Sequence, residues 1–397
     1  MIGTCGFRVR KSNIQIYLLL SFYLLFISQD VLFPVNFFVT NILSIIYSLI
    51  CFCFLVACNI RNRNSFVSCL SLFIIIHTIN FIFTQRVYFS ISGNPITGLF
   101  TIKNTYIALL SFFPFYYFYK RRCPSFRPIT IFLILYVIVV IVKFLTRKAD
   151  AEMMEGGDMM SNNAGYGFVA LLPFAALFLR RKFIALLLIL FSVVFIIASM
   201  KRGAILVGGG AVLVYFYNSF ANIKLSRHQK IINILSFVIG FVAVGVIAYL
   251  SYVSNANLQE RFSTISEGSG RDWIYEDLFS IWLYQSGILN YLLGYGINAT
   301  VHFVGFFAHN DWLELLLSLG ILGIILYVIL LRCLFKQSKK IIFCSDKIAL
   351  KMILFIWCVT SLFSMFYFEV NSFIYLMLIG MIMGKNDRLS QSQSFNS

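Results

Sequence analysis

One histidine of this chain lies where an ionisable side chain could take part in a reaction. His309 stands directly before an apolar stretch at about residues 310–331 that is long enough to cross a bilayer. We expect Asp311 to cap this helix, because Glu314 follows it at the spacing of a capping box. A positive helix end disfavours the imidazolium, so a neutral ring that accepts a proton near pH 7 is predicted, as a general base requires. The alternative is that His309 only caps the helix or lies among lipid headgroups.

A second set of candidates consists of basic side chains in segments that otherwise carry few of them. Lys201 and Arg202 occupy a tight predicted turn between two apolar stretches, which can aim a guanidinium into the mouth of a helix bundle; alternatively, both reach lipid headgroups. Arg271 follows a Gly-Ser-Gly run that permits close backbone approach, and Arg261 precedes it in the same segment. A guanidinium suits bidentate phosphate binding, although an ion pair with the acidic residues after Arg271 is equally open.

Arg202, Arg271 and His309 together make a set of two fixed cations and one titratable base, which would fit a substrate that bears a diphosphate. The sequence holds no Asp cluster and no His/Cys pattern typical of a metal site, so we expect neither a metal nor another cofactor. Positive side chains would then stabilise a diphosphate leaving group. Gly294, Tyr295 and Gly296 look like part of a potassium filter, but no Thr-Val precedes them and no pore-helix hairpin surrounds them, which argues against a channel.

The composition excludes a soluble globular protein. The chain has 397 residues, of which 60% are hydrophobic and 12% charged. Its net charge of +17 comes from short basic clusters between apolar stretches, so these residues are interpreted as topology determinants and no nucleic-acid partner is expected. The nine cysteines indicate no disulfide framework.

Twelve apolar stretches are long enough, or nearly long enough, to span a bilayer. They lie at about residues 14–33, 37–58, 66–84, 104–119, 128–146, 164–179, 183–199, 203–220, 231–253, 310–331, 350–367 and 371–384. The sixth and the last are short, and Pro173 can kink the sixth. We expect an all-α polytopic membrane protein with about twelve transmembrane helices.

The distribution of basic residues predicts the orientation. A cytoplasmic N-terminus places most of the 32 lysines and arginines on the inner side, so both termini are predicted to be cytoplasmic. The chain then divides into transmembrane helices at residues 1–253, a large outer loop at 254–308, and further helices with a cytoplasmic tail at 309–397. Within the loop, residues 272–285 have the pattern of an amphipathic helix, which would lie either on the membrane surface or against the helix bundle.

The candidate residues belong to a longer pattern. Its positions are Gly294, Tyr295, Gly296, Ala308, His309, Asn310, Leu313, Glu314, Gly320 and Gly323. This pattern resembles the C-terminal signature of the O-antigen polymerase and O-antigen ligase superfamily, and the turn at residues 199–203 looks like the Ser-x-Arg-Gly hairpin of that family. The resemblance covers about residues 199–330, whereas the first half matches only in its spans and topology.

The resemblance implies a bundle like that of lipid-carrier glycosyltransferases, with a periplasmic active site in the bacterial inner membrane. Members take a glycan from undecaprenyl diphosphate and join it to an acceptor hydroxyl with inversion and without a metal. Carried over to this chain, Arg202 and Arg271 would hold the diphosphate, and His309 would deprotonate or orient the acceptor. The expected supporting and substrate-binding residues are Lys201, Arg261, Tyr295, Asn310 and Glu314. The chain departs from the family pattern in that Lys201 precedes the hairpin arginine. Either Arg261 or Arg271 could be the equivalent of the family's loop arginine.

The sequence therefore favours an O-antigen polymerase that extends polysaccharide on its lipid carrier for lipopolysaccharide. The expected partners are the undecaprenyl-diphosphate-linked oligosaccharide, the growing O-antigen chain, a chain-length regulator protein and membrane lipids. A ligase that moves finished polymer onto lipid A core is the alternative within the superfamily. A flippase or transporter is the alternative from another class, but it would be expected to place ionisable residues at mid-membrane, whereas here they gather at one face.

Overall fold

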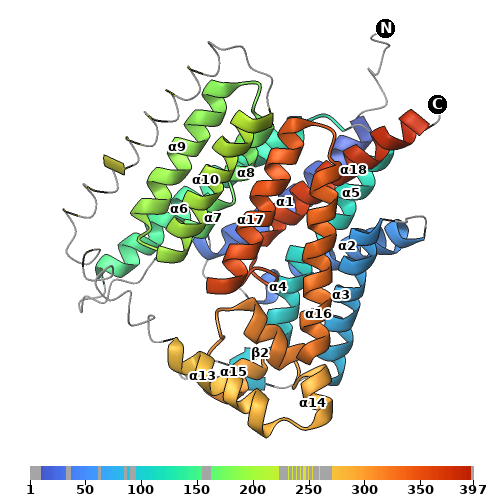
Figure 1. Cartoon of the computed structure of the whole chain (residues 1–397), viewed down its shortest axis with the longest axis vertical. Helices are drawn as coiled ribbons and strands as arrows, with labels where there is room; N and C mark the ends of the chain where they lie inside the picture. Colours follow the sequence, from blue (N-terminus) through green and yellow to red (C-terminus); the bar gives the residue numbers. More distant parts are fainter. Residues whose placement is uncertain are drawn as a thin grey trace.

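The structure is a computed structural model that describes residues 10–32, 37–60, 64–84, 87–89, 95–122, 124–153, 162–222 and 271–394, with isolated positions between 231 and 259. Nearly all described residues lie in helices (Figure 1). The described strands form a small antiparallel pair, β1 (Val87–Phe89) and β2 (Pro95–Thr97), in which Tyr88 lies opposite Ile96. The expectation of a helical membrane protein is confirmed at this level.

The helices follow the predicted apolar stretches closely. The first part of the chain forms α1 (Arg10–Leu32), α2 (Phe37–Asn59), α3 (Ser65–Phe83), α4 (Gly98–Leu110), α5 (Phe112–Arg121) and α6 (Arg127–Met153). The next part forms α7 (Ala164–Val169), α8 (Leu172–Leu177), α9 (Lys182–Ala198) and α10 (Arg202–Asn222). The last part forms α13 (Asp272–Ser280), the π-helix η2 (Ile281–Gln285), α14 (Ile288–Leu293), α15 (Ala299–Val304), α16 (Asp311–Lys340), α17 (Cys344–Phe363) and α18 (Ser372–Ser394).

Within the described residues, five helices are long and apolar enough to cross a membrane. They are Val39–Asn59, Ser65–Phe83, Arg127–Thr146, Arg202–Phe220 and Asp311–Lys340. Two further predicted stretches are interrupted: residues 104–119 break at Ser111 between α4 and α5, and residues 164–179 break between α7 and α8, next to Pro173. The predicted stretch at 231–253 lies mostly outside the described residues.

Close helix packing builds the core. α18 packs along α5, and α10 packs along α17. Gly380 and Gly384 form a Gly-x-x-x-Gly pair on α18. A Cβ added at Gly380 would lie 2.4 Å from the carbonyl oxygen of Phe112, and one added at Gly384 would lie 2.5 Å from that of Tyr116. Small residues at this spacing let two helix backbones approach each other, as in other helix pairs of membranes.

Polar contacts distinguish the two ends of the bundle. At one end, which we call the basic end, Asn13 bonds Ser125, Asn64 bonds Asp387, and the amide of Ile342 bonds Asn386. At the opposite end, which we call the His309 end, α13, α14 and α15 gather around the start of α16, in the lower part of Figure 1. Because α16 runs from the His309 end to the basic end and α17 returns, the last residues of α17 lie beside the first residues of α16.

Candidate active site

The start of α16 is fixed by Asn310. Its side-chain oxygen accepts hydrogen bonds from the amides of Trp312 and Leu313, so Asn310 is the N-cap. The prediction that Asp311 caps this helix was wrong, although the helix does begin within one turn of His309. Asp311 is fully buried, and its carboxylate accepts bonds from the Tyr327 hydroxyl at 2.5 Å and the Phe366 amide at 2.9 Å.

Glu314 holds the segment before the helix. Its Oε1 accepts a hydrogen bond from the Ala308 amide at 2.5 Å, and its Oε2 accepts one from the Thr300 hydroxyl at 2.8 Å. The capping-box prediction therefore placed the right residue near the helix start but gave it the wrong partner. Glu314 is buried, and both of its bonds connect the first turn of α16 to α15 and to the residue before His309.

His309 has a backbone conformation that non-glycine residues rarely adopt. Its φ is 51°, in the left-handed region. The residue on each side is anchored, because the Ala308 amide donates to Glu314 and the Asn310 side chain donates to the Leu362 carbonyl at 3.0 Å. Surrounding contacts of this kind are what maintain a strained conformation, and such conformations are concentrated at functional sites.

Two cations act on the His309 ring. Burial first, and then the charges of Arg271 and Lys201, lower the pKa of His309 to about 4. The neutral ring matches the expectation, but burial and the two cations account for it rather than the helix end. In this state the ring is a weaker base than a group with a pKa near 7.

Arg271 bridges the loop to the bundle. It occupies the position before α13 and donates from Nη1 to the Phe363 carbonyl at 2.9 Å, at the end of α17. Its predicted competitor, Arg261, lies outside the described residues. The structure thus brings Arg271, Lys201 and His309 into electrostatic range of one another, although they are far apart in the sequence.

The hairpin that carries Lys201 packs against α7. Met200 has a φ of 51°, and α10 begins at Arg202, so the turn between α9 and α10 is tight, as predicted. At Gly203 an added Cβ would lie 2.3 Å from the Tyr166 hydroxyl. Arg202 is partly exposed and adjoins Lys201, but it is Lys201 whose charge acts on His309.

Further polar residues, which the sequence did not indicate as candidates, lie at the same end. Tyr166 has a side-chain hydrogen bond with Ser364 and lies in electrostatic range of Arg271 and Glu369. Glu369 also accepts a bond from the Asn371 side chain at 3.1 Å. One signal was available, because Glu369 is a carboxylate in the short gap between the apolar stretches at 350–367 and 371–384.

The Gly-Tyr-Gly segment at residues 294–296 packs against α16 just before Gly320. Gly294 has a φ of 75°, and an added Cβ would lie 2.4 Å from the backbone of Ser318; Gly320, with a φ of 63° inside α16, is similarly pressed against the Leu292 backbone. The Tyr295 ring packs edge-on against Phe303, and its hydroxyl bonds Ser286 at 2.7 Å. These residues fix the kink of α16, and the structure connects Tyr295 to packing rather than to His309.

The predicted amphipathic helix is present as α13 and η2. Ile274 and Leu278 are buried against Ala299, Ala308 and Leu317. This is the arrangement in which the helix packs on the bundle, one of the two alternatives left open. Residues of its other face remain exposed, including Trp273, Phe279 and Tyr284.

No group of three His, Cys, Asp or Glu side chains that could hold a metal ion occurs in the part of the chain that the structure describes. A scan of the chain against protein-family models finds no match, and a search of curated proteins finds no significant similarity.

Proposed function

We propose that the protein is an O-antigen polymerase of the bacterial inner membrane, a glycosyltransferase that joins undecaprenyl-diphosphate-linked oligosaccharide units at the periplasmic face. The observation that carries the proposal is the meeting of Lys201, Arg271 and the half-buried, neutral His309 at one end of an apolar helical bundle. The resemblance of residues 294–323 to the superfamily signature supports the same assignment.

The three side chains suit the chemistry of an inverting transfer. The acceptor hydroxyl would attack the anomeric carbon of the donor sugar as the bond from that carbon to the diphosphate breaks. His309 would take the hydroxyl proton, and the leaving diphosphate would take the bonding electrons. Lys201 and Arg271 would stabilise the charge that develops on the diphosphate, which requires no metal in this scheme.

Substrate binding would adjust the basicity of His309. The pKa of about 4 belongs to the protein without substrate, in which the charges of Arg271 and Lys201 repel a proton from the ring. A bound diphosphate would offset both charges, and this would raise the pKa of His309 towards the range in which a general base is effective. Donor binding would thereby activate the base only when the leaving group is in place.

The neighbouring residues have supporting roles in this proposal. Asn310 and Glu314 orient the backbone around His309. Arg202 adds a third cation next to Lys201, and the Tyr295 amide donates to the Leu317 carbonyl, three residues before the kink of α16 at Gly320. Glu369 contributes a carboxylate at the same end, within electrostatic range of Tyr166.

Glycan gels from a strain that lacks the gene test the assignment. Loss of a polymerase leaves lipid A core bearing a single repeat unit, because an intact ligase still transfers the unpolymerised unit. Restoring the ladder with the wild-type gene, and not with an Arg271→Ala gene, would support the proposal. Bare core with polymer accumulated on the lipid carrier would assign the protein as the ligase, and bare core with single units trapped inside would indicate a flippase.

A further inference from the structure

The basic end holds a cavity of about 630 Å³ that the transfer chemistry does not use. Its walls come from the starts of α6, α9 and α17, the residues after α8, and α18. The volume lies within the range of about 300–1,000 Å³ that is usual for small-molecule sites. Because α9 runs from this cavity to the hairpin at residues 199–203, the cavity and His309 lie at opposite ends of the bundle.

The charge of the cavity is strongly positive. Arg127, Arg180, Arg181 and Lys385 line it, and no lining residue is acidic. Lys385 is already paired with Asp346 at 2.7 Å. The guanidinium groups of the three arginines have no carboxylate within ion-pair distance among the described residues. The cavity therefore presents three positive charges to an anion.

Helix starts add to this potential. α6 begins at Arg127, α9 at Lys182 and α17 at Cys344, so three positive helix ends converge on one cavity. Neither α9 nor α17 has a side-chain hydrogen bond at its N-cap. First-turn amides without a cap are suited to an anion, and the hydroxyl-bearing Thr130 and Ser345 also line the cavity.

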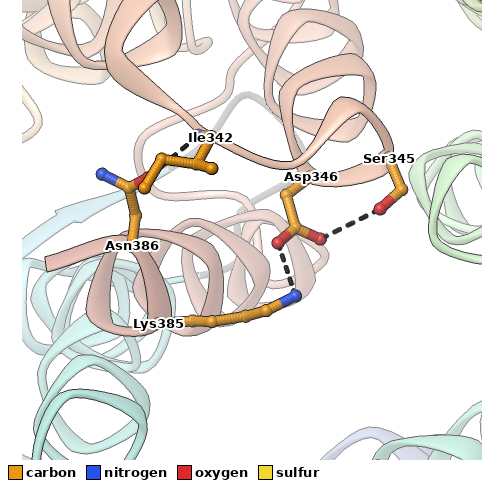
Figure 2. Close-up of polar contacts among 5 residues, drawn as sticks. All are labelled: Ile342, Ser345, Asp346, Lys385 and Asn386. Carbon is orange, nitrogen blue, oxygen red and sulfur yellow. Dashed lines mark hydrogen bonds and ion pairs between the residues drawn. The ribbon is translucent and has the colours of Figure 1, made fainter. Parts of the chain in front are cut away.

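The rim is held in place by contacts between α17 and α18. Figure 2 shows Asp346 between two donors, the Lys385 ammonium and, at 3.4 Å, the Ser345 hydroxyl. Beside them, the Ile342 amide donates to Asn386 Oδ1 at 3.0 Å. These bonds fix the start of α17 relative to Lys385, so one wall of the cavity exists before any ligand binds.

The same cavity has an aromatic side. Phe126 and Phe178 meet edge-on with ring centroids 5.8 Å apart, and the Lys385 ammonium lies 4.3 Å from the ring centroid of Phe343. Cations together with aromatic rings at the end of membrane helices match a molecule with an anionic head and an apolar body.

We propose that this cavity binds the phosphate of an anionic phospholipid headgroup from the surrounding membrane. The arginines and the open helix starts would hold the phosphate, and the aromatic rings would contact the glycerol and the first acyl carbons. The proposal is independent of the glycosyl transfer, since it rests on the opposite end of the bundle. Basic residues in cytoplasmic loops also have an ordinary role in orientation, so the test must separate a defined site from general attraction.

The test uses the purified full-length protein in a neutral detergent. Dioleoyl-phosphatidylglycerol, dioleoyl-phosphatidylcholine and inorganic phosphate are titrated separately, and bound lipid is counted by native mass spectrometry. We expect saturable binding of phosphatidylglycerol that weakens about 30-fold in Arg180→Gln/Arg181→Gln. The matched control is Arg121→Gln/Arg122→Gln, which removes two exposed arginines outside the cavity and should leave binding unchanged.

Equal binding of both lipids, or equal loss in both double variants, would overturn the proposal, because either result indicates general attraction rather than a site. Inorganic phosphate is also added to the protein with bound phosphatidylglycerol. If millimolar phosphate displaces the lipid, the result would overturn the lipid assignment in favour of a soluble phosphate compound. If the double variant is not monodisperse, Arg127→Gln and Arg180→Gln are measured singly, and unchanged affinity in both would equally contradict the site.

Discussion

At the scale of single residues, His309 is defined by contacts on both sides and by two charges. Its left-handed backbone is fixed through Ala308 and Asn310, and its ring is neutral because burial, Arg271 and Lys201 all disfavour the imidazolium. The type of residue and its place before a helix were evident in the sequence. The sequence did not show that Lys201, rather than Arg202, is the cation that acts on His309. Two neighbouring basic residues in a turn differ in the direction that the fold gives each side chain, and this direction is not evident from the sequence.

Arg271 provides the first test at this scale. Arg271→Ala should lower the rate of chain extension by about 10²–10³-fold, because the leaving diphosphate loses one of its stabilising donors. Arg271→Lys should restore only part of the rate, since an ammonium cannot reproduce the planar fork of a guanidinium. The rate is measured on membranes with matched protein levels, with Arg121→Ala as the control. Full activity in both Arg271→Ala and Lys201→Ala would remove the diphosphate site from the account.

The pH profile tests the electrostatic coupling. The neutral imidazole is the active form, so kcat/KM, which reports the protein without substrate, should fall on the acid side only near the pKa of about 4. Lys201→Gln removes a positive charge that repels the proton, so the pKa of His309 rises and the acid fall of kcat/KM moves to higher pH. Lys340→Gln, at the basic end, is the matched control. An acid fall that stays in place, or moves to lower pH, would contradict the coupling.

At the scale of elements, the helix positions followed from apolar stretches, but the contacts between them did not. Asn310 and Asp311 are both good caps, and the sequence cannot choose between them. Tertiary contacts decide, because the Asp311 carboxylate bonds Tyr327 and Phe366, which leaves Asn310 at the helix start. The Thr300 bond to Glu314 is likewise set by how α15 meets α16, and no local pattern predicts it.

Glu314 tests the link between α15 and α16. Glu314→Ala leaves the Ala308 amide and the Thr300 hydroxyl without their partner in a buried place, at a cost of about 1–3 kcal/mol for each group. We expect a clear fall in the unfolding temperature, followed by tryptophan fluorescence in detergent. Thr300→Val, which removes only one of the two bonds, should have a smaller effect. An unchanged unfolding temperature in Glu314→Ala would show that these bonds do not hold the segment.

At the scale of the whole molecule, the described polar contacts divide the bundle into a basic end and a His309 end. The basic residues around the cavity, which were predicted to be cytoplasmic, lie at the opposite end of the bundle from His309. The distribution of basic residues in the sequence had indicated this separation. α16 has 30 residues and is kinked at Gly320, so the 20 residues after the kink alone make about 30 Å of helix, the thickness of the hydrocarbon core. Its first turns, and His309 before them, can therefore lie outside the hydrocarbon.

Thiol labelling tests the orientation. A cysteine at Tyr284, a side chain that is 80% exposed, should react with an impermeant reagent in intact spheroplasts. A cysteine at Lys340, at the basic end, should react only after lysis. Both are compared with the wild-type chain, whose own cysteines give the background. The reverse pattern would invert the topology and place His309 in the cytoplasm.

In the proposed reaction, His309 serves as the base for transfer from a lipid diphosphate. The direct measurement is the extension of a synthetic undecaprenyl-diphosphate oligosaccharide by purified protein, resolved by chain length. His309→Ala should lose about 10²–10⁴-fold in rate while remaining folded, the usual contribution of general acid/base assistance. His302→Ala, which alters an exposed histidine on the neighbouring α15, should extend chains at the wild-type rate. A wild-type rate in His309→Ala, or an equal loss in both variants, would contradict the claim.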